Sequence, residues 1–154
     1  MEMILDDIEK AIGRPLPIVY KKLLETIDDF EYIDGPNDYS DSESRKSWFF
    51  LGMARLGKII HMDGALDRPE WKAIESYVEI DKKYRRRTHA PSDSGPVDYD
   101  RLNKSVVIAS DEGDYLYFDV IDNFSLWEYW HDSGEVVKIS DSFDAWAKSM
   151  VRDI

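Results

Sequence analysis

The chain has 154 residues, of which 43% are hydrophobic and 13% are aromatic, and its formal net charge at pH 7 is −12. This composition excludes a disordered chain, and the length predicts one globular domain over residues 1–154. The negative charge repels a nucleic-acid backbone and favours a protein partner with a basic surface.

No apolar run is long enough to cross a bilayer, so we expect no membrane span. The first 13 residues carry acidic side chains where a secretory signal needs a basic start and an apolar middle. Cysteine is absent, which excludes disulfides and thiolate zinc sites. Together these features predict a cytoplasmic protein.

Apolar residues recur at helical spacing in the first part of the chain. The spacing of Ile4, Ile8 and Ile12 predicts a helix that ends at Gly13. A second apolar face runs from residue 16 to residue 27, and Pro17 suits the first turn of that helix. We therefore expect two helices joined by a tight link.

The strongest local charge bias lies between Glu25 and Ser44, where the chain has eight acidic residues and no Lys or Arg. Gly, Pro and Asn at 35–37, followed by the Ser/Asp run at 40–44, predict an exposed loop. Such a loop can simply be solvated. Alternatively it forms a negatively charged docking surface, with Tyr32 and Tyr39 as the aromatic anchors that interface centres favour.

The middle of the chain has a mixed pattern. SWFFL at 47–51 predicts a strand, whereas residues 53–62 are ambiguous between strand and helix. A third helix is expected to be capped near Asp67, with an apolar stripe that begins at Trp71. The basic run at 82–87 that follows resembles either a phosphate-binding patch or a solvated helix end, and the overall acidity favours the solvated helix end.

Three strands are expected in the second half of the chain. Residues 106–109 favour a strand, 110–114 a turn, and 115–121 a strand with one inward face and one outward face. The outward face is expected to carry Tyr115, Tyr117 and Asp119. The third strand should run from Leu126 to His131.

The last part of the chain predicts a hairpin and a helix. Asp132-Ser133-Gly134 fits a three-residue loop with glycine in the left-handed position, and residues 136–139 fit the returning strand. Asp141 then suits the N-cap of a helix whose apolar stripe runs from Phe143 to Val151. We expect this amphipathic helix to close the chain.

Catalytic and metal-binding patterns are weak. His131 and Asp132 could bind a metal only with further ligands from His61-x-Asp63 or His89, and nothing in the spacing forces these residues together. The carboxylates at 111–119 could form an acid/base pair, but the sequence does not give their separation. No phosphate-binding glycine loop or nucleophile elbow occurs. We therefore expect no cofactor, no metal and no catalytic residue.

Three stretches carry a family resemblance: IGRPLPIVYKKLLE at 12–25, VVIASDEGDYLYFDV at 106–120, and WEYWHDSGEVVKISDSFDAWAKSM at 127–150. Their order and content resemble the SUKH superfamily, also called the SMI/KNR domain. The resemblance implies an α+β fold in which a mainly antiparallel sheet is flanked by helices. It further implies, for bacterial members, immunity proteins that bind and block a cognate toxin, often a nuclease.

The leading hypothesis is thus a non-enzymatic inhibitor that binds the basic surface of a cognate toxin. The alternatives are an intracellular regulatory or scaffolding module, which the same superfamily includes, and a carboxylate-dependent enzyme. Whether the protein self-associates stays open. The residues expected to bind the partner are six acids and two tyrosines: Asp28, Asp29, Glu31, Tyr32, Asp34, Asp38, Tyr39 and Asp41.

Overall fold

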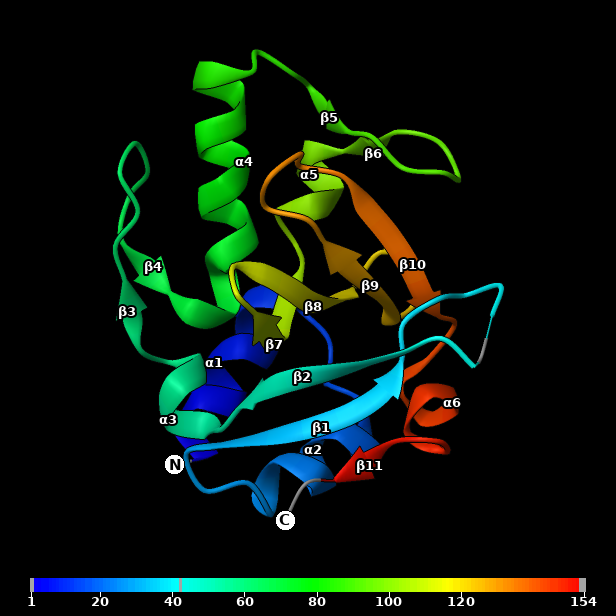
Figure 1. Cartoon of the computed structure of the whole chain (residues 1–154). Coiled ribbons are helices and arrows are strands. Elements are labelled where there is room, and N and C mark those ends of the chain that lie inside the picture. The colour runs from blue at the N-terminus through cyan, green and yellow to red at the C-terminus, as the bar shows by residue number, and fades with distance from the viewer. Residues whose placement is uncertain (1, 42, 153–154) are drawn as a thin grey trace.

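Seven antiparallel strands form the centre of the protein in the computed structural model, which describes residues 2–41 and 43–152. Their spatial order is β10-β9-β8-β7-β2-β1-β11 (Figure 1). The strands are β1 (Phe30–Pro36), β2 (Arg45–Leu51), β7 (Val106–Asp111), β8 (Asp114–Asp119), β9 (Ser125–Tyr129), β10 (Val136–Ser140) and β11 (Val151–Arg152). The predicted α+β fold with a mainly antiparallel sheet is confirmed.

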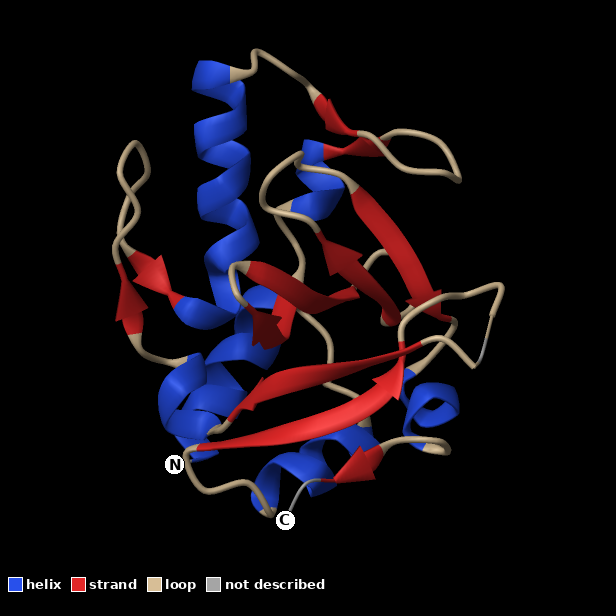
Figure 2. Ribbon diagram, viewed as in Figure 1, coloured by secondary structure: helices blue, strands red, loops and turns tan. Residues whose placement is uncertain are grey.

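Helices and two short hairpins surround this sheet (Figure 2). The helices are α1 (Glu2–Ile12), α2 (Ile18–Glu25), α3 (Met53–Leu56), the 3-10 turn η1 (Glu70–Lys72), α4 (Ala73–Tyr84), α5 (Tyr99–Leu102) and α6 (Phe143–Ala147). The hairpins pair β3 (Ile59–Ile60) with β4 (Arg68–Pro69), and β5 (His89–Ala90) with β6 (Val97–Asp98). None of the helices that the structure describes has the length and apolarity of a membrane span.

The first two helices follow their sequence pattern. α1 ends before Gly13, whose φ of 74° is the left-handed conformation that glycine adopts without strain. Pro17 occupies the N-cap of α2 instead of its first turn. The apolar face of α2 is buried, with Tyr20 and Leu24 both at 1% exposure or less. Both predicted helices and the link between them are confirmed.

Helices cover both faces of the sheet around β8. The Phe118 ring lies 5.2 Å from the ring of Tyr20 on α2. Tyr115 lies on the opposite face of the strand, and its ring is 6.1 Å from the ring of Tyr77 on α4. Figure 1 shows α4 beside β7 and β8. The outward face predicted for this strand is therefore wrong, because all three of its members are buried: Tyr115, Tyr117 and Asp119.

The hairpin near the carboxyl terminus forms as predicted, except for the length of its connection. Gly134 has a φ of 77°, and its N–H donates to the carbonyl of Trp130 at 2.7 Å. β9 and β10 pair from Tyr129↔Val136 onward. The left-handed glycine and the returning strand are thus confirmed, but the connection is longer than the predicted three residues, because residues 130–135 lie between β9 and β10. The strand before them ends at Tyr129, so His131 lies in the connection and not at the end of the strand.

The acidic segment between Glu25 and Ser44 is not one exposed loop, which corrects the sequence prediction. Its central part is β1, which pairs with β2 along its whole length and with β11 on its other side. Gly35 and Pro36 remain in this strand despite their turn-forming character. Loop structure is confined to 26–29 and to 37–44, of which Ser42 lies outside the described residues.

Three further boundaries differ from prediction. Residues 53–62, which were ambiguous, contain both a helical turn and a strand, α3 and β3. Asp67 does not cap the third helix; its carboxylate lies 2.9 Å from Nδ1 of His61, and α4 begins only at Ala73. The turn after β7 is narrower than predicted, since Glu112 and Gly113 have positive φ and Asp111 and Asp114 are still paired.

The closing helix is shorter than its apolar pattern predicts. Ser142, not Asp141, is the N-cap, and its hydroxyl accepts a hydrogen bond from the N–H of Ala145 at 3.1 Å. α6 then ends at Ala147, and the chain returns to the sheet as β11. The described chain therefore closes with an edge strand and not with an amphipathic helix.

Candidate partner-binding surface

The eight residues that we expect to bind a partner follow the chain through three environments. Asp28 and Asp29 precede β1, three more residues belong to β1, and the last three lie in the loop that connects β1 to β2. In β1, Glu31 points into the protein, whereas Tyr32 and Asp34 lie on the opposite, more exposed face. The set is therefore dispersed over more than one surface.

Three of the six acids are neutralised by arginines of the same chain. An oxygen of Asp29 lies 3.2 Å from Arg55, and one of Asp34 lies 2.6 Å from Arg45. Glu31 is only 8% exposed and accepts a hydrogen bond from Arg152 of β11 at 2.6 Å. Because each of these carboxylates already has a cation beside it, their combined field at a distance is weak.

The other three acids, Asp28, Asp38 and Asp41, form no ion pair with the described residues of the chain. Asp38 accepts hydrogen bonds from the N–H and the hydroxyl of Ser40, and the backbone bond is the main reason why the pKa of Asp38 lies below its usual value. Asp41 accepts a bond from the N–H of Glu43. The loop after β1 thus carries uncompensated negative charge.

The two tyrosines do not lie together. Tyr32 is 47% exposed on the outer face of β1 and packs edge-on against Phe30 and Phe49, with centroids 6.0 and 5.4 Å apart. Four extended residues, about 13 Å, separate Tyr32 from the end of β1, and Tyr39 lies beyond that end. The structure therefore assigns Tyr32 to an aromatic patch on the sheet and Tyr39 to the acidic loop.

Tyr39 is held beside β10, the edge strand at the opposite end of the sheet from β11. Its hydroxyl donates to the carboxylate of Asp141, 3.0 and 3.1 Å from the two oxygens, and the Nζ of Lys138 lies 5.3 Å from the ring centroid. The bond to Asp141 raises the pKa of the Tyr39 hydroxyl, which therefore stays protonated. These contacts fix a ring that is still 55% exposed, so it can contact a partner with little loss of entropy.

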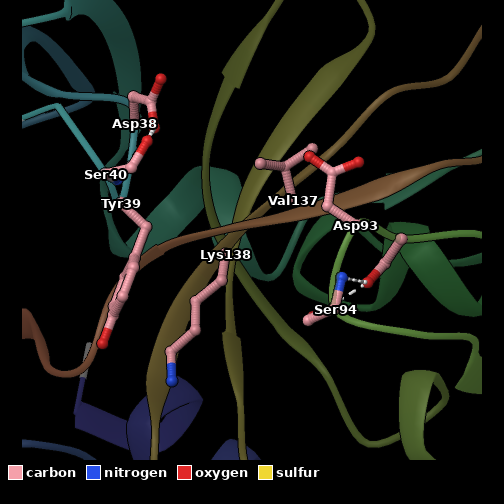
Figure 3. Close-up of a pocket in the computed structure, with 8 residues that line it drawn as sticks. Asp38, Tyr39, Ser40, Asp93, Ser94, Val137 and Lys138 are labelled. Atoms are coloured by element: carbon pink, nitrogen blue, oxygen red, sulfur yellow. Dashed lines mark hydrogen bonds between the residues drawn. The ribbon is translucent and has the colours of Figure 1, made fainter.

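A groove of about 350 Å³ lies beside Tyr39 (Figure 3). One wall is the loop at 38–40, the other is the tip of the β5–β6 hairpin at 92–94, and Val137 and Lys138 of β10 lie between them. Figure 3 shows Asp38 and Asp93 on the two walls, with Lys138 between them. The contribution of Asp93 was not predicted, because it is 55 residues away in the sequence and no local pattern links it to the acidic loop.

The lysine in this groove does not cancel the charge of the walls. Lys138 Nζ lies 2.9 Å from Asp141 and 3.3 Å from Asp122, and the bond to Asp141 is the main cause of its raised pKa. One ammonium therefore serves two carboxylates. Asp93, like Asp38, has no ion-pair partner among the described residues. The groove consequently has a surplus of negative charge.

The basic run after α4 has a structural role. Arg85 donates to Asp81 at 2.7 Å and to the carbonyl of Asp132, and Arg87 donates to the carbonyl of Ser133. The two arginines thus join the end of α4 to the β9–β10 loop. The prediction of a solvated helix end was incomplete, because these two guanidinium groups form hydrogen bonds with carboxylate and carbonyl oxygens of the same chain.

The candidate metal and catalytic residues also have partners within the fold. Asp119 is 2% exposed; it accepts from Arg101 at 2.6 Å and from the N–H of Asp122 at 3.0 Å. His131 Nδ1 lies 2.7 Å from Asp114. The ring of His61 lies next to two exposed aspartates on the β3–β4 hairpin. In the described part of the chain, no three His or carboxylate residues converge as metal ligands.

Two other carboxylates of residues 111–119, Asp111 and Asp114, belong to a charged cluster around Lys46. Its ammonium lies 2.6 Å from Glu128, 3.2 Å from Asp111 and 3.9 Å from Asp114. Burial is the main cause of a raised pKa at Glu128. The cluster joins β2 to β7, β8 and β9, and therefore connects the two halves of the sheet.

Searches of curated proteins and of solved structures found no significant match. The sequence profile of the SMI1 / KNR4 family (SUKH-1) matches residues 2–149, almost the entire chain. The chain therefore belongs to the SMI1 / KNR4 family (SUKH-1).

Proposed function

We propose that this protein is an immunity protein, a non-enzymatic inhibitor that binds a cognate toxin and covers its active site. Family membership supports a protein-binding role of this kind. The observation that carries the proposal is the uncompensated acidic loop after β1, in which Asp38 and Asp41 flank the exposed ring of Tyr39.

Electrostatics explains how such a surface would act on a nuclease toxin. A nuclease is positively charged where it holds the phosphate backbone, so a protein with a net charge of −12 is attracted to that site from a distance. Steering of this kind can raise association rates to about 10⁸–10⁹ M⁻¹s⁻¹ at low salt. Once bound, the inhibitor excludes the substrate because it occupies the same positive surface.

The arrangement of the loop suits this role. Uncompensated carboxylates provide the long-range attraction, whereas Tyr39 offers a rigid aromatic surface for short-range contact. The three acids that pair with arginines, Asp29, Glu31 and Asp34, each have a cation of the same chain beside them and contribute less to attraction. In this proposal the interface is therefore centred on Asp38, Tyr39 and Asp41, with Asp28 and Tyr32 as further candidates.

Co-expression tests the proposal directly. The toxin-like gene product encoded next to this chain is induced in a host with and without the chain, and growth is measured. We expect the chain to restore growth and to form a complex that survives gel filtration. Failure to restore growth, together with capture of partners unrelated to toxins from the native cell, would favour the regulatory or scaffolding alternative.

A further inference from the structure

β10 is the last strand of the sheet, and no strand among residues 2–41 and 43–152 lies beside its outer edge. Such an edge presents backbone N–H and C=O groups that can pair with another chain. Figure 1 shows this edge between two loops, the tip of the β5–β6 hairpin and the loop between β1 and β2. These loops are the walls of the groove in Figure 3.

The first residue of β10 already forms a hydrogen bond at this edge with another part of the chain. The N–H of Val136 donates to the carbonyl of Pro91 at 3.0 Å and so points away from β9. Because the N–H groups of alternate residues point to the same side of a strand, Lys138 turns its N–H towards the same edge as Val136; the register with β9 shifts only after Lys138, between Lys138 and Ser140. Among the described residues, no group outside the sheet bonds to the backbone of Lys138. One backbone donor, the N–H of Lys138, thus faces the groove.

The walls of the groove determine what can lie against this edge. Asp38 and Asp93 place one carboxylate on each side, and neither forms an ion pair with a described residue. Tyr39 adds an exposed aromatic face that already lies near one cation, Lys138. A segment that binds here must be extended, to pair with the strand, and must carry Lys or Arg, to balance the carboxylates.

We propose that an extended, basic segment of the cognate toxin adds to the edge of β10, pairs with the backbone of Lys138 and places its cationic side chains against Asp38 and Asp93. This inference rests on the proposed function, since it locates where the toxin docks. It assigns specificity to the two walls and the pairing itself to the main chain of β10.

Amide hydrogen exchange with and without the purified toxin tests the pairing. We expect exchange of the Lys138 amide, measured on a fragment covering 136–140, to slow at least tenfold on binding. A fragment from α1 serves as the reference for unchanged exchange. Protection that is confined to other surfaces would overturn the proposal.

Charge reversal tests the walls. Replacing both Asp38 and Asp93 by Lys should weaken toxin binding by about tenfold or more. The control reverses Asp7 and Glu25, which are exposed on α1 and α2 and change the net charge by the same amount. We expect the control to weaken binding by less than about threefold. Equal affinity of the groove variant and the wild type would contradict the proposal.

Two variants of one residue isolate the main-chain bond. Lys138→Ala removes the side chain and keeps the N–H, whereas Lys138→Pro removes both. We expect the Pro variant to bind more weakly than the Ala variant, and thermal unfolding of each shows whether it is folded. If the wild-type chain protects cells while no groove variant affects binding, the docking site is wrong and the function stands. If the wild-type chain neither protects nor binds, the function fails.

Discussion

The indole of Trp146 on α6 donates a hydrogen bond to the carbonyl of Pro36 at 2.7 Å, and the same ring lies directly on the backbone of Gly35. A Cβ added to Gly35 would overlap the Cζ2 and Cε2 atoms of the indole. Trp146 is 1% exposed and cannot move aside without disturbing the rings of Phe50 and Phe143. Glycine at this position in β1 is therefore required by the packing of α6.

Gly35→Ala should destabilise the protein by about 1–3 kcal/mol, because it overpacks a filled core. Urea unfolding at pH 7 measures the change. Gly13→Ala is a suitable control: its added Cβ would meet no atom within 4 Å, and its positive φ costs about 1–2 kcal/mol without a clash. An unchanged midpoint for Gly35→Ala would show that the indole does not pack on this strand as described.

Arg152→Ala should cost about 1–3 kcal/mol, because it leaves the buried carboxylate of Glu31 without its partner. The comparison is Arg45→Ala, which breaks the more exposed pair with Asp34 and should cost at most about 1 kcal/mol from that pair. Unfolding free energies of the two variants give the difference. The reverse ranking would show that β11 contributes little to the sheet.

The missed strand β1 shows where local sequence signals stop being sufficient. Residues 34–37 read Asp-Gly-Pro-Asn, which favours a turn, and the pattern predicted a loop. In the structure, Gly35 is in the strand because Trp146 needs the space, and Pro36 is tolerated where β1 ends. The first reason involves a residue more than 100 positions away, so no local pattern could reveal it.

Elements with clear periodicity were predicted well. The spacing of Ile4, Ile8 and Ile12 predicted α1 correctly, and Gly134 predicted the turn between β9 and β10. Both elements depend on interactions between residues that are close in the sequence. The two walls of the groove depend instead on the tertiary fold. Asp38 could be singled out by the charge bias of its segment, but Asp93 joins it only because the β5–β6 hairpin folds over β10.

Acid should remove a stabilising contact at Asp122. The Ser125 hydroxyl bonds to this carboxylate and, with Lys138, lowers its pKa below the usual 3.8. The stability that this contact contributes is therefore fully present above the pKa of Asp122 in the unfolded chain. It is lost as the pH falls through the lower pKa of Asp122 in the folded protein. Asp122→Asn should destabilise at pH 7 by less than about 1 kcal/mol, since the group is partly exposed, and should have no effect near pH 2.

Urea unfolding of the wild type and Asp122→Asn across this pH range makes the comparison. A difference between the two proteins that persists unchanged near pH 2 would contradict the assignment, because the wild-type carboxylate is then protonated as well.

Chelation should leave the protein unchanged. The described residues bring no three His or carboxylate side chains into a metal-binding arrangement, and His131 is bonded to Asp114. We expect dialysis against EDTA to alter neither the unfolding midpoint nor toxin binding. Elemental analysis of the purified protein accompanies the measurement. A stoichiometric metal whose removal abolishes binding would show that charge on the surface is not what recognises the partner.

Association kinetics should separate the free acids from the paired ones. Replacing Asp38 and Asp41 by Lys should slow toxin association about tenfold at low salt, because both carboxylates lack an ion-pair partner among the described residues. The control variant replaces Asp7 on α1 and Glu25 on α2 by Lys, which changes the net charge by the same amount outside the loop that follows β1. Stopped-flow mixing at several salt concentrations compares the two variants.

The salt dependence distinguishes a local effect from a global one. At 0.15 M salt the screening length is about 8 Å, so the field of an exposed acid hardly extends beyond its own neighbourhood. If docking involves the loop after β1, the loop variant should associate more slowly than the control at low salt, and the two rates should converge as salt increases. Identical rates at every salt concentration would mean that only the net charge of −12 steers the partner, and the loop would then have no special part in recognition.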